Sequence, residues 1–187
     1  RARPRDARGG VLTAVGHEGV EYYNKLGYVP YDVGINENAA RTLEYATADF
    51  ALSRLAAALG KTEDARKYAA QAQNYRKLYD KESGWMRGRN QDGSWSTPFN
   101  PLKWGEAFTE GNSLHYSWSV MQDVQGLADL MGGDKAFVDR LDSIFATPPL
   151  FDDSYYGQTI HEIREMQIVN KGNYAHGNQP IQHMTYL

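Results

Sequence analysis

The sequence predicts an all-α domain, and three observations support this class. Apolar residues recur at helical spacing in four segments. Short turns join these segments in pairs, as in hairpins of two helices. The 187 residues include 41% hydrophobic and 23% charged residues, a composition typical of a globular domain with a core of its own.

The first predicted helix follows a connecting segment, residues 1–36, that is rich in Gly, Pro and Tyr. Asn36 or Asn38 is expected to cap this helix, which runs to about Leu59 and is stopped by Gly60. Two apolar stripes predict burial on both faces. One stripe holds Tyr45, Ala48, Leu52, Leu55 and Leu59, and the other holds Leu43, Ala46 and Phe50.

The second predicted helix begins with Thr62 as its cap and runs to about Tyr79. Its single apolar stripe holds Ala65, Tyr68, Ala72, Tyr75 and Tyr79, and its opposite face is polar. A helix buried on two faces followed by a helix buried on one predicts an αα-hairpin with an inner and an outer member.

A second hairpin is predicted downstream. Its first helix spans about 113–131, with a stripe of Val120, Val124, Leu127 and Met131. Asp134 is expected to cap the next helix, which turns Phe137, Leu141 and Ile144 inward and ends at Thr147-Pro148-Pro149. Long loops are expected at 81–111 and 148–177, and a last helix from about Pro180. Loops of this length are usually functional.

Inner and outer hairpins joined by long loops predict part of an (α/α)6 toroid. A closed ring of such hairpins needs several hundred residues. Residues 1–187 are therefore expected to form a partial catalytic domain of a larger enzyme. A small open helical domain is the alternative.

Charge and composition exclude several classes of function. The net charge of −3 argues against binding to nucleic acid or anionic membranes. The absence of cysteine excludes disulfides and thiol catalysis. No apolar run reaches the ~20 residues of a membrane-spanning helix. The 13 Tyr, 4 Trp and 6 Phe suit either a carbohydrate cleft or a protein interface.

Glu110 is the best candidate for a general acid. It lies among the aromatic residues Phe108, Tyr116 and Trp118, which are expected to desolvate it partly. Desolvation favours the protonated form of a carboxyl group. An ordinary loop acid is the alternative. Hydrolysis of a glycoside generally needs a second carboxylate, and neither Asp123 nor Glu106 is a convincing partner.

Two further loops carry polar groups. His161 and Glu162 can bond sugar hydroxyls, or they can begin a solvated helix with Glu165 one turn later. Asn178 offers the oxygen ligand that calcium prefers, or it can cap a turn at Gly177. The histidines show no zinc-binding pattern.

Six motifs in one order are similar to those of the glycoside hydrolase family 92 α-mannosidases, and the resemblance covers nearly the whole chain. The motifs are Tyr22–Pro30, Arg41–Ala46, Trp85–Asn90, Phe108–Asn112, Asp123–Leu127 with Met131–Gly133, and Tyr174–Pro180.

The resemblance implies a calcium-dependent, inverting exo-α-mannosidase that acts on α-1,2-linked mannose. It implies an N-terminal β-sandwich beside an (α/α)6 catalytic domain, and a secreted, periplasmic or cell-surface location. Glu110 would be the general acid. His161 and Glu162 would contact the leaving mannose. Asn112 and His176 would also bind sugar, and Glu165 and Asn178 would be calcium ligands.

This chain departs from the family in three respects. The β-sandwich and the segment that carries the base aspartates are absent, so the isolated chain is expected to be inactive and to need the rest of its domain as partner. Leu114 and Gln122 stand where relatives more often have Trp and His. The remaining alternatives are a non-catalytic carbohydrate-binding protein with a helical ring, and a trehalase-like or glucoamylase-like toroid glycosidase.

Overall fold

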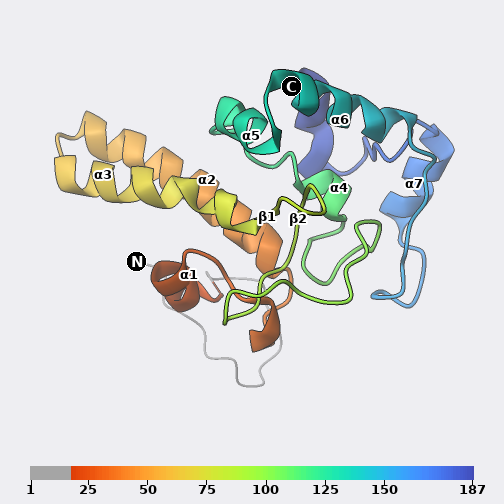
Figure 1. Cartoon of the computed structure of the whole chain (residues 1–187), viewed down its shortest axis with the longest axis horizontal. Coiled ribbons are helices and arrows are strands. Elements are labelled where there is room, and N and C mark those ends of the chain that lie inside the picture. The colour runs from red at the N-terminus through yellow and green to blue at the C-terminus, as the bar shows by residue number, and fades with distance from the viewer. Residues whose placement is uncertain (1–17) are drawn as a thin grey trace.

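The structure, a computed structural model, describes residues 18–187 and is mostly helical, which confirms the all-α class. A helical hairpin extends to one side of the molecule, and the later helices gather on the other side (Figure 1). Between them lies a small antiparallel sheet made of β1 (Tyr79–Asp80) and β2 (Trp85–Met86). No helix of the described residues is long and apolar enough to cross a membrane.

The expected connecting segment contains two short helices within its described part. These are α1 (Val20–Leu26) and the 3-10 helix η1 (Tyr31–Val33). Tyr23 anchors α1, because its buried hydroxyl donates a 2.8 Å hydrogen bond to Asp49 Oδ2. The prediction of a purely connecting segment is therefore wrong from residue 20 onward.

The first predicted hairpin is confirmed. It consists of α2 (Asn38–Ala58) and α3 (Thr62–Gln71), and α3 continues into the 3-10 helix η2 (Ala72–Leu78). Gly60 has a φ of 70° and so reverses the chain in the left-handed region, as expected. Thr62 is the first residue of α3 and makes no side-chain cap, so its predicted role is wrong.

Only one face of α2 is buried among the described residues. Small side chains, Ala46, Ser53 and Ala56, lie on its buried face. The stripe of large side chains faces outward, and Leu55 and Leu59 are 56% and 62% exposed. The prediction of burial on both faces thus fails within residues 18–187.

The long helix predicted over 113–131 is divided into α4 (Ser113–Tyr116) and α5 (Val124–Met131). Where α4 ends, the Ser117 hydroxyl donates to the Ser113 carbonyl (2.7 Å) and accepts the amide of Met86 in β2 (2.9 Å), which ties α4 to the sheet. Asp123 then starts α5 by accepting the Gly126 amide at 3.1 Å.

The last third of the chain forms α6 (Asp134–Ala146), α7 (His161–Val169) and the 3-10 helix η3 (Gln179–Tyr186). The expected inward residues of α6 are buried, but Asp134 is its first residue and does not cap it. α7 lies inside the long loop predicted at 148–177. It forms because Ile163 and Met166, three residues apart, are both fully buried.

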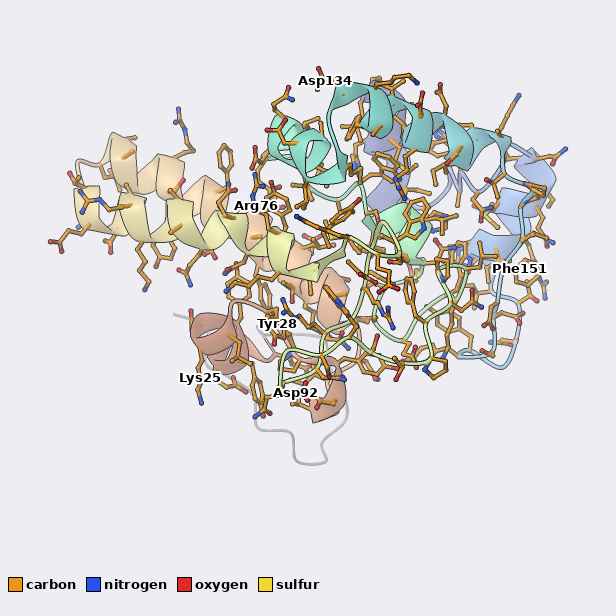
Figure 2. The ribbon with its side chains drawn as sticks, in the orientation of Figure 1. Lys25, Tyr28, Arg76, Asp92, Asp134 and Phe151 are labelled. Atoms are coloured by element: carbon orange, nitrogen blue, oxygen red, sulfur yellow. The ribbon has the colours of Figure 1, made fainter. Side chains whose placement is uncertain are left out.

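Aromatic contacts and one ion pair hold the parts together. Trp118 meets Phe137 of α6 edge to face at 5.2 Å between ring centroids. Arg76, labelled in Figure 2, lies at the end of the hairpin and pairs with Asp123 at 3.3 Å. The Tyr75 hydroxyl donates to the same Asp123 carboxylate at 2.7 Å. Asp123 therefore links the hairpin to α5.

Candidate active site

Glu110 lies in a tight loop, residues 105–111, which we call the Glu110 loop. The Gly105 amide donates to the Gly111 carbonyl at 2.9 Å and closes the loop. Glu106 and Glu110 have φ values of 61° and 47°, in the left-handed region. This conformation costs a residue with a side chain roughly 1–2 kcal/mol. Such strain persists only where the surroundings impose it, and it is often found at functional sites.

The Glu110 loop is attached to the start of α2. The amides of Ala39 and Ala40 both donate to the Ala107 carbonyl at 3.0 Å, and the Glu37 amide donates to the Glu106 carbonyl at 2.7 Å. The first amides of a helix lack partners within the helix, so the loop satisfies them. A helix of 21 residues thus becomes the support of the loop.

Three further contacts fix the backbone around Glu110. The Tyr116 hydroxyl donates to the Thr109 carbonyl at 2.8 Å. The Asn178 side-chain amide donates to the Glu110 carbonyl. The Tyr156 hydroxyl bonds to the Glu110 backbone, and burial raises the pKa of Tyr156 to about 12, so this hydroxyl stays protonated. The loop is therefore held from α4, from the segment before α7, and from the start of η3.

The Glu110 side chain itself is exposed. The rings of Phe108, Tyr116 and Trp118 are buried in the core, where Phe108 stacks on Tyr116 at 5.2 Å. They support the loop from beneath instead of covering the carboxylate. The expected desolvation by these three rings is therefore absent from the described part of the chain.

Asn112 and His115 fix the exit from the loop. The Asn112 side-chain oxygen accepts the His115 amide at 3.2 Å, and the Asn112 amide donates to His115 Nδ1 at 3.2 Å. His115 Nε2 lies 2.7 Å from the Asn173 carbonyl. Because Nδ1 accepts, Nε2 carries the proton. Burial lowers the pKa of His115 to about 4, so the ring is neutral.

Asn112 is fully buried, which gives it a positioning role in this structure. Its contact with sugar stays a prediction.

The structure also shows the two positions at which this chain departs from its relatives. Leu114 is buried in the core, and Gln122 Oε1 accepts the Thr47 hydroxyl at 3.0 Å.

His161 and Glu162 begin α7 and pair with each other. His161 Nε2 lies 3.0 Å from Glu162 Oε1, with side-chain exposures of 78% and 9%. Glu162 is nearly buried, so His161 is the member of the pair that lies at the surface of the described residues. Their contact with a leaving sugar stays a prediction.

The two predicted calcium ligands come together through Gly177. A Cβ atom at Gly177 would lie 1.9 Å from Glu165 Oε2, so glycine lets this carboxylate reach the backbone beside Asn178. Asn178 is buried and uses its amide nitrogen on Glu110, which leaves its carbonyl oxygen for a cation. Both donors are hard oxygens, the kind that calcium takes.

The pair does not complete a metal site. Nowhere in residues 18–187 do three or more His, Cys, Asp or Glu side chains gather closely enough to hold an ion. Calcium normally takes six to eight oxygen ligands. Glu165 and Asn178 therefore fit a calcium ion only as part of a larger set.

His176 is exposed near this pair, and its Nδ1 lies 2.6 Å from the Tyr174 hydroxyl. The structure thus joins Asn178 to Glu110 by a hydrogen bond and places the Glu165 carboxylate against Gly177, the residue before Asn178. The supporting roles of Tyr116 and Tyr156 were not predicted from the sequence. Tyr156 lies in the long loop predicted at 148–177, and the sequence pattern gave no signal for its contact with the Glu110 backbone.

The chain is similar to one protein family and to several solved structures. The profile of the glycosyl hydrolase family 92 catalytic domain matches residues 2–187. The GH92 inverting mannosidase BT2199 of Bacteroides thetaiotaomicron VPI-5482 is 48% identical, with a TM-score of 0.78 over 96% of this chain and 24% of that one. The GH92 α-mannosidase BT3965 of Bacteroides thetaiotaomicron is 36% identical, with a TM-score of 0.74 over 89% of this chain and 20% of that one.

The structure of BT3965 in complex with mannoimidazole gives 35% identity and a TM-score of 0.76, over 89% of this chain and 22% of that one. None of the curated proteins compared matches the chain. The chain spans between a fifth and a quarter of the length of these solved relatives. The family profile covers nearly all of it, which sets aside the trehalase-like and glucoamylase-like alternatives. This chain belongs to glycoside hydrolase family 92, within its catalytic domain.

Proposed function

We propose that the protein containing this chain is a calcium-dependent, inverting exo-α-mannosidase that hydrolyses α-1,2-linked mannose, with Glu110 as its general acid. Family membership supports a mannosidase, and two solved relatives are described as mannosidases, one of them bound to mannoimidazole. The observation that carries the proposal is the exposed Glu110 carboxyl on a strained loop whose backbone is held by three separate segments.

The proposed role of Glu110 is to donate a proton to the glycosidic oxygen as the bond to the leaving sugar breaks. A fixed loop limits the positions that the carboxyl can take, which reduces the entropy lost on reaching the reactive geometry. Inversion also needs a carboxylate that activates water on the opposite face of the sugar, with the two carboxyl groups ~6.5–9.5 Å apart. We propose that this base lies outside these 187 residues.

His161 and Glu162 would hold hydroxyls of the leaving mannose, the ring nitrogen and the carboxylate oxygen each making one hydrogen bond. Glu165 and Asn178 would contribute two of the calcium ligands. Bound calcium would supply a positive charge that orients hydroxyls of the reacting mannose. Because Asn178 also donates to the Glu110 carbonyl, it would hold the acid loop and the metal site in one arrangement.

Replacement of the acid tests the proposal in the full-length protein. Glu110→Gln should lower the turnover of α-1,2-mannobiose by ~10²–10⁴-fold, the usual contribution of a general acid, and should keep sugar binding. Turnover of a mannoside with a dinitrophenyl leaving group should fall far less, because that group departs without a proton. Glu63→Gln, an exposed acid on α3, is the control. Normal turnover of the disaccharide by Glu110→Gln would refute the assignment.

Removal of calcium tests the metal assignment separately. A chelator should abolish turnover, and added calcium should restore it. Glu165→Gln should weaken calcium binding at least tenfold, or ~1.4 kcal/mol, in a calorimetric titration. Gly177→Ala should act in the same direction, because its Cβ displaces the Glu165 carboxylate. Unchanged calcium affinity in both variants would remove Glu165 from the ligand set.

A further inference from the structure

A pocket of about 240 Å³ opens beside the Glu110 loop, apart from the groups assigned above. Its walls come from η1 and the segment that follows it, the start of α2, the Glu110 loop and the segment before α7. They are Tyr31, Gly34, Ile35, Asn36, Asn38, Glu106 and Tyr155. The volume lies below the ~300–1,000 Å³ of pockets for drug-sized ligands and suits a single sugar ring.

Glu106 supplies the charged wall of this pocket. Its Oε1 lies 3.0 Å from Lys103 Nζ, and the Tyr31 hydroxyl bonds to its side chain. Burial, and then this bond to Glu106, raise the pKa of Tyr31 to about 12, so Tyr31 remains the donor. Because Lys103 offsets the charge of Glu106, the wall favours a neutral ligand with hydroxyl groups over a cation.

Asn38 supplies an acceptor that lacks a donor. The residue is 2% exposed, and its side-chain amide donates to the Ile35 carbonyl at 3.0 Å. Its Oδ1 is buried and has no hydrogen-bond partner within residues 18–187. A buried acceptor without a partner costs roughly 1–3 kcal/mol. Oδ1 has almost no exposed surface, so a ligand hydroxyl in the pocket would provide the missing donor once the Asn38 side chain rotates toward it.

Tyr155 supplies an aromatic wall. It is 40% exposed, and a Cβ at Gly105 would lie 2.3 Å from its Cδ1, so its ring rests on the backbone of the Glu110 loop. Its ring meets Tyr156 edge to face at 5.1 Å. Tyr156 in turn bonds to the Glu110 backbone. The pocket and the acid loop therefore share one wall.

Taken together, an aromatic face, a compensated carboxylate and a buried acceptor without a donor are the groups that bind a sugar ring. We propose that this pocket binds a sugar unit of the glycan that is not part of the cleaved bond, with its ring against Tyr155 and its hydroxyls bonded to Glu106 and Asn38. This inference rests on the proposed function and extends it to longer glycans.

Binding measured in the full-length protein tests the pocket. In the Glu110→Gln background, calorimetry with α-mannotriose and α-mannobiose gives the ratio of the trisaccharide affinity to the disaccharide affinity. We expect a preference for the trisaccharide. Tyr155→Ala and Glu106→Gln should each lower that ratio about tenfold, and Tyr155→Phe, which keeps the ring, should preserve it.

The outcomes separate this inference from the proposed function. A ratio that both variants leave unchanged, or an absence of preference for the trisaccharide, overturns the pocket. General damage to the fold would weaken both sugars equally and so would also leave the ratio unchanged. Hydrolysis of α-mannobiose by the unmodified protein tests the function independently. If hydrolysis is absent but the ratio still falls in both variants, the enzymatic proposal fails and the pocket stands.

Discussion

At the scale of single residues, His115 shows how burial fixes a protonation state next to the candidate site. The ring is fully enclosed, receives the Asn112 amide on Nδ1 and donates from Nε2 to the Asn173 carbonyl. It also meets Trp104 edge to face at 4.8 Å. A proton added to Nδ1 would break the bond to Asn112, and the charge would be buried. The neutral ring is thus required by the packing that holds the Glu110 loop.

His115 should make the stability of the protein depend on pH. Its pKa is about 4 in the folded state and ~6.5 in the unfolded chain. As the pH falls below about 6.5, the unfolded chain binds the proton first, so stability decreases until about pH 4. The expected loss between pH 7 and pH 5 is ~2 kcal/mol, measured by urea unfolding.

Two variants identify the source of this pH dependence. His115→Asn should flatten the decrease between pH 7 and pH 5, whatever its stability at pH 7. His161→Gln should leave the decrease unchanged, because His161 is exposed. An equal slope in His115→Asn and the unmodified protein would contradict the assignment.

At the scale of elements, a buried ion pair secures the small sheet next to α4. Arg87 Nη1 lies 3.0 Å from Asp80 Oδ2, and the Arg87 guanidinium also donates to the Ser96 carbonyl. Burial alone would raise the pKa of Asp80, but hydrogen bonds from Arg87 and Ser83 outweigh it and hold this pKa below its ordinary value. The pair therefore stays ionised in a poorly solvated place.

Breaking this pair should be costly. Arg87→Met leaves the Asp80 carboxylate buried without its partner, and the expected loss is ~3–5 kcal/mol in the free energy of unfolding. The double variant Asp80→Asn with Arg87→Met should recover part of that loss, because the uncompensated charge is gone. Losses that simply add in the double variant would show that the two side chains are not coupled.

Strong periodicity explains which elements the sequence predicted. α2 and α6 were predicted nearly to their observed ends, because each carries several apolar residues at helical spacing. The division of 113–131 was missed. Where α4 ends, Ser117 accepts the amide of Met86, 31 residues away, a contact that the local pattern does not show. α7 was placed in a loop, since Ile163 and Met166 alone give a weak pattern.

The sequence motifs named the residues of the candidate site. They did not predict how those residues contact one another. Asn178 and Glu110 are 68 residues apart, and nothing in either motif indicated that the side-chain amide of one bonds the carbonyl of the other. The expected desolvation of Glu110 failed for a related reason. Sequence places three aromatic residues near it, but their rings turn into the core.

At the scale of the whole molecule, the outer face of α2 is the main feature without a partner among residues 18–187. Leu52, Leu55 and Leu59 are 42%, 56% and 62% exposed on a hairpin that extends from the rest of the structure (Figure 1). The chain spans between a fifth and a quarter of the length of its solved relatives. We propose that the rest of the catalytic domain covers this stripe.

Charged substitutions test this packing in the full-length protein. Leu55→Glu and Leu59→Glu should each lower the free energy of unfolding by about 2 kcal/mol or more, because an unpaired charge would be buried. Ile168→Glu on α7 is the matched control, since Ile168 is 82% exposed, and it should be nearly neutral. Equal, small effects at all three positions would mean that the stripe faces water.

The attachment of the Glu110 loop to α2 also makes the loop observable. Ala39 and Ala40 donate their amides to the Ala107 carbonyl, so these protons can exchange with solvent only when the loop lifts from the helix. Their hydrogen-exchange rates therefore report how often the Glu110 loop opens in the native protein. A substitution that loosens the loop, such as Tyr116→Phe, should speed exchange at these two amides while leaving the middle of α2 protected.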